Sequence, residues 1–206
     1  MAGNDDGIIT LEEIIEQFAT AMRNVDRRAP RAVNPLTGHV YQPGIGPHPE
    51  DRAVDLILLE LAVQRPHWRW RIRACHGRMN HLCDWLLGDP VQWAIEIKMA
   101  RPNKDNGKPH DTGVTGILSP YPADRSALSE CVNLARSGIT SRLAIVIYGF
   151  DDLRRPLTHI ISAFETLAKA QVNLGVQRCA PLGPLVHPVH KSGAVYGWEI
   201  YRRVDP

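Results

Sequence analysis

The sequence predicts an α/β fold in which helices flank a mixed central β-sheet. Apolar residues recur at helical spacing in several segments, which indicates amphipathic helices. Residues 68–74 alternate strictly between apolar and basic side chains, and residues 143–148 form an apolar run between two helical segments. Helices and strands in this alternation are typical of a sheet covered by helices.

The length and composition predict one domain. The chain has 206 residues, of which 44% are hydrophobic and 22% charged, as in an average soluble globular protein. We expect a single domain over residues 1–206, with an N-terminal helix and irregular extension (1–48), a catalytic core (49–150), and a C-terminal helix and hairpin (151–206). Disordered, collagen-like and coiled-coil proteins are excluded by this composition.

The first 64 residues predict two helices joined by an irregular segment. The first helix should begin at Thr10, because Thr10 and Glu13 fit a capping box. The segment after Val25 is rich in proline and glycine, and it leads into a helix over residues 49–64 that begins at Pro49. Since the second helix is apolar on most of its circumference, we expect it to pack deeply against the sheet.

Three antiparallel strands are expected next, over residues 68–74, 80–87 and 91–99. In the first strand Trp68, Trp70 and Ile72 share one face, and arginines occupy the other. The turn between the second and third strands falls at residues 88–90. Residues 101–122 are polar and contain several glycines and prolines, so we expect a mobile loop without apolar anchors.

The remaining elements complete the sheet. We expect a helix over residues 123–136, a buried strand over 142–148 and a helix over 157–173. Two final strands, over residues 176–189 and 194–202, should form a hairpin that turns at residues 191–193.

Composition also bears on the location of the protein. The apolar runs are far shorter than a membrane span, and Asp5 and Asp6 give the N-terminus the wrong charge for a signal peptide. The four cysteines form no CxxC pair, which favours reduced thiols. We therefore expect a cytoplasmic protein with no membrane association. The net charge of +2 does not by itself indicate a nucleic-acid-binding protein.

Three charged residues on the second and third strands are candidates for catalysis. Glu96 and Lys98 are separated by one residue and therefore share a strand face. If the turn centres on residues 89 and 90, Asp84 falls opposite Ile95 and next to Glu96. Two adjacent carboxylates repel each other unless a cation lies between them, and carboxylate oxygens suit Mg²⁺. The alternative is an ordinary cross-strand salt bridge between Lys98 and the two acids.

The same residues carry a family resemblance. Asp84, an eleven-residue gap and the sequence Glu96-Ile97-Lys98 at the end of an apolar strand resemble the restriction-endonuclease-like nucleases of the PD-(D/E)xK superfamily. The expected order helix, three antiparallel strands, helix, strand over residues 49–148 is similar to that family's core. Cys83 stands where the written motif has proline.

The resemblance implies a metal-dependent DNA endonuclease, in a restriction or defence context, that acts as a homodimer. Asp84, Glu96 and the carbonyl of Ile97 would bind Mg²⁺, for which Mn²⁺ can substitute, and Lys98 would assist the attacking water. Many members add a glutamate from the first core helix, for which Glu50 is the preferred candidate and Glu60 the other.

Basic residues near this site are candidates for binding DNA through its phosphates. They are Arg69, Arg71 and Arg73 on the first strand, and Arg101, Lys104 and Lys108 after the third. The alternatives are a solvated strand face and a solvated loop. His187 and His190 have a spacing that zinc sites use, but no cysteine or acid lies nearby in the sequence, so a structural role is favoured. The sequence does not separate DNA from RNA as substrate, nor an active enzyme from a binding module of the same fold.

Overall fold

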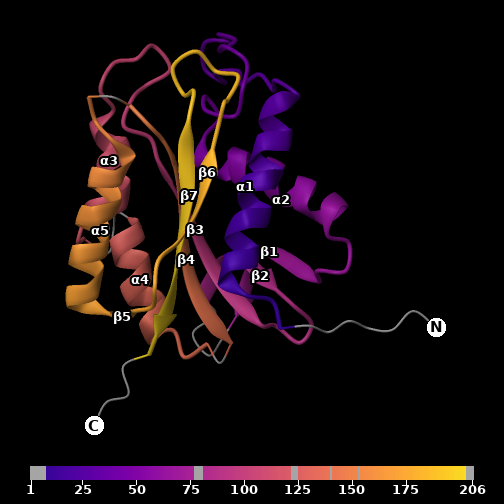
Figure 1. Ribbon diagram of the computed structural model, residues 1–206, viewed down its shortest axis with the longest axis vertical. Coiled ribbons are helices and arrows are strands. Elements are labelled where there is room, and N and C mark those ends of the chain that lie inside the picture. Colours follow the sequence, from indigo (N-terminus) through magenta and orange to yellow (C-terminus); the bar gives the residue numbers. More distant parts are fainter. Residues whose placement is uncertain (1–7, 77–80, 122–124, 140, 153, 203–206) are drawn as a thin grey trace.

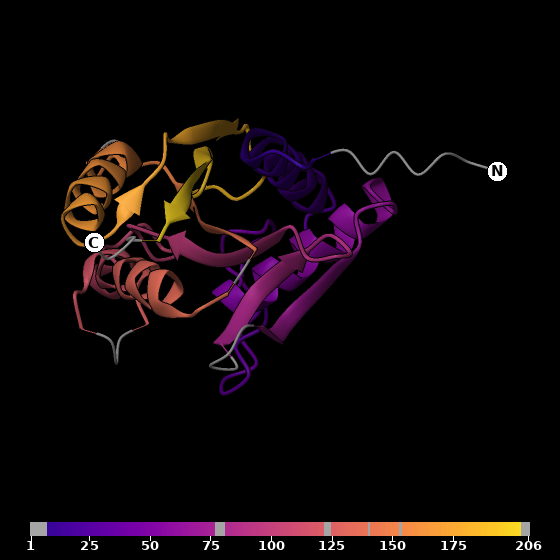
Figure 2. The same ribbon diagram turned by 90° about the horizontal axis from the view of Figure 1, so that it is seen from below.

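Helices cover both faces of one mixed β-sheet. The computed structural model describes residues 8–76, 81–121, 125–139, 141–152 and 154–202, and these residues include five helices and a seven-stranded sheet. Helices α1 (Leu11–Arg27) and α2 (Glu50–Gln64) lie on one side of the sheet. Helices α3 (Asp111–Leu118), α4 (Ala127–Arg136) and α5 (Leu157–Gln171) lie on the other (Figures 1 and 2). The expected α/β architecture with a mixed sheet is confirmed.

The strand order is β1-β2-β3-β4-β7-β5, and β6 pairs with β7 beside this path. Strands β1 (Trp70–His76), β2 (His81–Leu87) and β3 (Trp93–Ala100) form the expected antiparallel meander. Strand β4 (Arg142–Phe150) runs parallel to β3 and antiparallel to β7 (Gly193–Tyr201). The short strands β5 (Asn173–Leu174) and β6 (Arg178–Leu182) both pair with β7.

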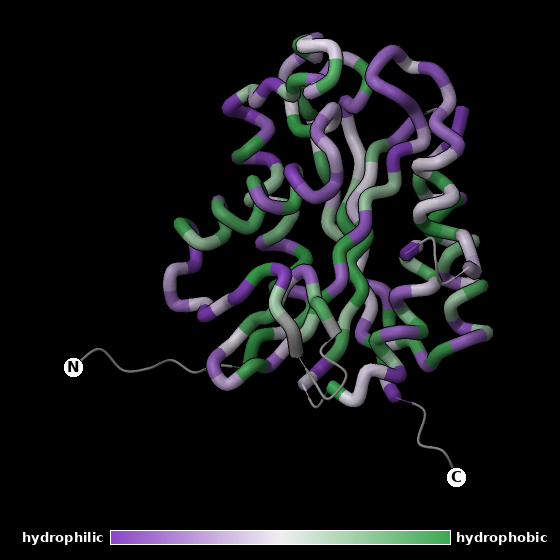
Figure 3. Tube along the Cα trace, turned by 180° about the vertical axis from the view of Figure 1, so that it is seen from behind, coloured by the Kyte–Doolittle hydropathy of each residue, from purple (hydrophilic) through white to green (hydrophobic). Residues whose placement is uncertain are grey.

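Helix α1 begins as its capping pattern predicts. The Thr10 side chain accepts a hydrogen bond from the Glu13 amide at 3.2 Å. The apolar residues Leu11, Ile14, Ile15 and Phe18 are all buried against the sheet. In Figure 3 the central strands are largely hydrophobic, whereas hydrophobic and hydrophilic stretches alternate along the helices, as expected for amphipathic elements at a sheet surface.

Helix α2 is less deeply packed than the sequence predicts. Its residues Ala53, Ile57, Leu58 and Leu61 are buried, but Leu59 is 53% exposed and Val63 is 77% exposed. The helix packs beside α1 and touches the end of β3, so its outer side faces away from the core.

The region after β3 contains more secondary structure than the sequence predicts. Residues 101–110 fold back on themselves, with a bridge between Asn103 and Pro109 and a hydrogen bond of 2.8 Å from the Lys104 amide to the Lys108 carbonyl. Helix α3 follows, and its Ile117 is fully buried in the core beneath α4 and α5. The prediction that this region lacks an apolar anchor is therefore wrong. Pro122, at its predicted end, lies outside the described residues.

Two other boundaries differ from the sequence analysis. Helix α4 begins at Ala127, where the Ser126 side chain accepts a hydrogen bond from the Ser129 amide at 3.1 Å. The predicted start at Ala123 lies outside the described residues. The strand expected over residues 176–189 is only β6, because residues 183–192 form an irregular connection to β7.

A buried carboxylate joins the irregular connections to α1. Asp26 is 1% exposed and accepts hydrogen bonds from the Ile45 amide at 2.9 Å and the Val186 amide at 2.7 Å. One side chain thus fixes two loops that are far apart in sequence. Those loops and residues 101–110 gather at the upper end of the sheet in Figure 1.

Cys131 and Cys179 are free thiols in the described part of the chain. Among the described helices, none has the length and hydropathy to cross a membrane.

The substitution Asp26→Ala is expected to lower the free energy of unfolding by about 2–4 kcal/mol, because it leaves the buried Ile45 amide and the partly buried Val186 amide without acceptors. Urea denaturation measures this loss. Asp26→Asn, which keeps one acceptor oxygen, should lose less. Glu16→Ala, at an exposed acid on the same helix, is the control and should change stability by no more than about 0.5 kcal/mol. Equal effects of Asp26→Ala and Glu16→Ala would contradict this account of the junction.

Candidate active site

The site begins where β2 ends its pairing with β3. The paired residues are Leu87 with Trp93, Leu86 with Ala94 and Trp85 with Ile95. The next residue, Asp84, therefore falls opposite Glu96, one position from where the sequence analysis placed it. The Asp84 carboxylate accepts a hydrogen bond from the Ile97 amide at 2.8 Å. A side-chain oxygen thus occupies the place that a strand carbonyl would otherwise take.

A second carboxylate caps the next amide on the same edge of β3. Glu50, the first residue of α2, accepts a hydrogen bond from the Met99 amide at 2.5 Å. Ile97 and Met99 are two residues apart, so their amides point to the same side of the strand. The Ile97 carbonyl points to that side as well, because a strand residue directs its amide and carbonyl together.

Glu96 and Lys98 project from β3 into the same neighbourhood. Their opposite-face neighbours Ile95 and Ile97 belong to the apolar core under α1 and α2, as the alternation predicts. Glu96 is 4% exposed. The Lys98 Nζ lies 3.6 Å from the Glu50 Oε1, and its side chain is largely buried. The structure therefore brings together all four of the preferred catalytic candidates at one end of β3.

The charges of this cluster act strongly on one another. The pKa of Glu96 is raised well above the ordinary value, first by burial and then by the charge of Asp84 and a hydrogen bond with it. Burial also raises the pKa of Glu50, although Lys98 partly offsets this effect. For Lys98, burial would lower the pKa, but the charges of Glu50, Asp84 and Glu96 raise it overall. Lys98 is therefore held as an ammonium ion among acids.

The donor set suits a hard divalent cation, although the side chains are not arranged around one. Glu50, Asp84 and Glu96 supply carboxylate oxygens, which Mg²⁺ prefers. No group of three or more histidine, cysteine, aspartate or glutamate side chains in the described residues has the arrangement of a preformed metal site. Two of the carboxylates are instead engaged by backbone amides. A cation would thus have to compete with hydrogen bonds that each use one oxygen of the carboxylate.

Glu60, the other glutamate considered, lies away from this cluster. Its carboxylate forms an ion pair with Arg28 at 2.7 Å and accepts hydrogen bonds from Asn24 and Gln64. These contacts join α2 to α1, and they lower the pKa of Glu60 in spite of its partial burial. The polar residue that interrupts the apolar run of α2 thus has structural partners.

The basic residues of β1 are spread along the edge of the sheet. Arg69 lies near the turn between β2 and β3, since its carbonyl accepts a hydrogen bond from the Gly88 amide, and it is therefore remote from Lys98. Arg71 is exposed. Arg73 lies nearer the cluster, but it forms an ion pair with Asp55 at 3.1 Å and donates to the Asp51 carbonyl on α2.

The basic residues after β3 lie closer to the cluster. The Arg101 Nη1 donates to the Gly46 carbonyl at 2.9 Å and lies 3.7 Å from the Asp105 carboxylate. Lys104 and Lys108 are exposed on the folded-back segment.

The connection from Asp105 to a histidine pair is not predicted by the sequence. The rings of His187 and His190 stack at 4.8 Å, and both residues are buried. The His190 Nε2 lies 3.4 Å from Asp105. Gly46 packs on this pair, and a Cβ there would collide with the His190 ring. The short spacing of the two histidines was visible in the sequence, but their acidic partner lies 85 residues away in the chain.

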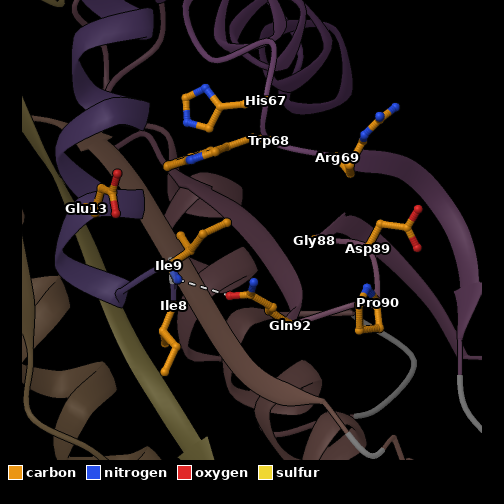
Figure 4. A pocket seen from close by; sticks show the side chains of 10 residues that line it. All are labelled: Ile8, Ile9, Glu13, His67, Trp68, Arg69, Gly88, Asp89, Pro90 and Gln92. Carbon is orange, nitrogen blue, oxygen red and sulfur yellow. Dashed lines mark hydrogen bonds between the residues drawn. The ribbon is translucent and has the colours of Figure 1, made fainter. Parts of the chain in front are cut away.

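Another pocket lies at the opposite end of β3, beside its first residues (Figure 4). It has a volume of about 420 Å³ and is lined by Glu13, His67, Trp68, Asp89 and Gln92 among others. In Figure 4 the Ile9 amide donates a hydrogen bond to the Gln92 side chain, and both residues line the pocket. None of the four clustered residues lines this pocket, so it is separate from the candidate active site.

Comparisons of this chain with protein-family models, curated proteins and solved structures found no match.

Glu96→Gln is expected to stabilise the metal-free protein near pH 8. Since the pKa of Glu96 is raised in the folded state, ionising it costs about 1.4 kcal/mol for each unit of the shift. Below the unfolded-state pKa the carboxyl is protonated in both states, so the gain should vanish as the pH falls towards 4. Urea denaturation in the presence of a chelator, over this pH range, measures the difference. A gain that does not depend on pH, or a loss near pH 8, would contradict the electrostatic account.

Proposed function

We propose that this protein is a metal-dependent phosphodiesterase with a restriction-endonuclease-like core that hydrolyses DNA. The convergence of Glu50, Asp84, Glu96 and Lys98 at the end of β3 is the observation that carries the proposal. The order α2, β1 to β3, α4 and β4 supports it, because the resemblance found in the sequence implies this order around the same residues. Helix α3 is an addition to that order.

Each residue of the candidate site would have its own role in hydrolysis. Asp84, Glu96 and the Ile97 carbonyl would hold a Mg²⁺ ion, with Glu50 as a further carboxylate. When bound, such an ion polarises the phosphate and lowers the pKa of a coordinated water. Lys98 donates hydrogen bonds from a fixed position, so it can orient the attacking water and offset the negative charge that develops on the phosphate.

A substitution at the site is expected to affect DNA cleavage and DNA binding differently. Lys98→Ala should abolish cleavage of duplex DNA in Mg²⁺ or Mn²⁺ and leave DNA affinity nearly unchanged, because phosphate contacts supply most of the affinity. Lys169→Ala, at an exposed lysine on α5, is the matched control and should cleave like the wild type. A gel assay of cleavage, combined with a binding assay in Ca²⁺, measures both properties.

The same assays decide between the proposed enzyme and its rivals. Cleavage of RNA alone would make the protein a ribonuclease. If wild type and Lys98→Ala were equally inert on single-stranded DNA, duplex DNA and RNA, a binding module without catalysis would replace the proposed enzyme. Asp84→Ala could tighten DNA binding, because it removes a negative charge near the phosphate path.

Metal binding itself has a separate readout. Mn²⁺ or Mg²⁺ at about 100 times its Kd should stabilise the wild type by about 2.7 kcal/mol, since the ion binds only the folded state. Asp84→Asn should lose most of this effect. Asp89→Asn, at an exposed aspartate in the turn at the other end of β2, is the control and should keep it. Thermal unfolding with and without metal measures the shift, and equal shifts in the three proteins would argue against a metal site at Asp84.

A further inference from the structure

A polar pocket opens beyond the end of β3, next to the candidate active site. It has a volume of about 480 Å³ and is bordered by two segments that are far apart in sequence. The lining residues are His39, Val40, Tyr41 and Gln42 from the loop before α2, and Arg101, Lys104, Asp105, Asn106 and His110 from the segment after β3. None of the residues proposed above to hold the metal ion or to orient the attacking water lines this pocket.

Both walls are held by backbone hydrogen bonds. On one side, the Tyr41 amide donates to the Ala32 carbonyl at 2.9 Å, and Val33 bridges to Val40. On the other side, the bridge between Asn103 and Pro109 holds the folded-back segment. The hydrogen bond of 2.9 Å from Arg101 to the Gly46 carbonyl joins the two walls.

The pocket combines cationic and aromatic groups. Arg101 and Lys104 supply positive charge, and Asp105 is engaged by Arg101 and by His190. The Arg101 Nε is buried and has no hydrogen-bond partner among the residues that the structure describes. His39 and Tyr41 form an edge-to-face ring pair with centroids 5.1 Å apart. The amides of Gln42 and Asn106 add groups that can both donate and accept hydrogen bonds.

We propose that this pocket binds one nucleoside monophosphate unit, with its phosphate at Arg101 and Lys104 and its base against Tyr41 and His39. Arginine and lysine are the usual partners of phosphate, and aromatic rings are the usual platform for an unpaired base. The amides of Gln42 and Asn106 would contact polar edges of the base.

The position of the pocket deepens the proposed function, on which this part of the inference rests. Arg101 follows Lys98 by three residues, or about 10 Å along an extended strand. A nucleotide in the pocket would therefore belong to the strand being cut and would flank the scissile phosphate. Because a base that stacks on a protein ring must leave its own helix, the preferred substrate would carry an unpaired nucleotide at this place.

The first test measures binding without cleavage. The metal-free protein is titrated with deoxynucleoside monophosphates, and calorimetry or NMR measures their binding. We expect this binding to saturate. The corresponding nucleoside and inorganic phosphate should each bind at least about fivefold more weakly, because each lacks half of the contacts. Equal binding of inorganic phosphate and the monophosphates would overturn the role of the aromatic pair, and absence of saturable monophosphate binding would overturn the proposal.

Matched variants locate the ligand. Tyr41→Ala should weaken monophosphate binding at least about fivefold, the lower end of what one base stack supplies, whereas Tyr41→Phe should retain it. Lys104→Ala should weaken it similarly, and Lys191→Ala, at an exposed lysine before β7 and outside the pocket, should change it less than about twofold. These positions are at the surface, and thermal unfolding confirms that each variant is folded. Equal effects of Lys104→Ala and Lys191→Ala would mean diffuse charge attraction and overturn the pocket.

The second test distinguishes a nucleotide within a strand from a free nucleotide. A duplex with an unpaired nucleotide should compete with the bound monophosphate more strongly than a blunt duplex of the same length and charge. Equal competition would overturn the link to the cut strand. If the protein cleaves no nucleic acid but binds the monophosphate in a way that depends on Tyr41, the proposed nucleotide pocket stands and the proposed nuclease function is overturned. If the protein cleaves nucleic acid but does not bind the monophosphate, the proposed nuclease function stands and the proposed nucleotide pocket is overturned.

Discussion

The separation of β2 from β3 is the constraint on which the candidate site depends. Beyond the pair Trp85 and Ile95, β3 continues for five residues beside β4, but its other edge has amides that need acceptors. A buried amide without a partner costs about as much as a lost hydrogen bond. Carboxylates from β2 and from the start of α2 supply those acceptors. The acids are thus drawn to one place by the backbone, and their mutual repulsion is a consequence.

The repulsion among the three acids is only partly offset by other groups of the chain. Lys98 brings one positive charge to a group of three acids, and Glu96 is too buried for water to screen its charge. Glu96 responds with a raised pKa, so part of the repulsion is relieved by holding a proton. A structure that needed only hydrogen-bond acceptors at this edge would be served as well by neutral amide side chains. The proposed metal site would account for acids at these positions, because a bound cation would offset their mutual repulsion.

The sequence predicts the sheet better than it predicts the connections. Strict alternation in β1 and an apolar run in β4 are local signals, and both led to strands near the observed positions. Helix α3 has no comparable signal, because its sequence contains Gly113 and Gly116, which are poor helix formers. Gly113 is explained only by the fold, since a Cβ there would collide with the Arg101 carbonyl. Tertiary contact overrides propensity at that position.

The candidate site shows the same division. The spacing of Glu96 and Lys98 on one strand predicts that they share a face, and the hairpin predicts that Asp84 lies beside them. The choice between Glu50 and Glu60 could not be made from α2 alone, because it depends on which end of the helix meets β3 and which side meets α1.

The loops that Asp26 holds together give the candidate site a fixed border at the end of the sheet where β3 ends. Asp26 holds the loops around Ile45 and Val186, and His190 connects the second of these to Asp105. Arg101 returns from the end of β3 to the first loop. These contacts form a closed network of buried and partly buried polar groups, and such networks rigidify the elements that they join. The segment that follows β3 is therefore positioned by three parts of the chain, and a ligand in the adjoining pocket would meet a surface that is already organised.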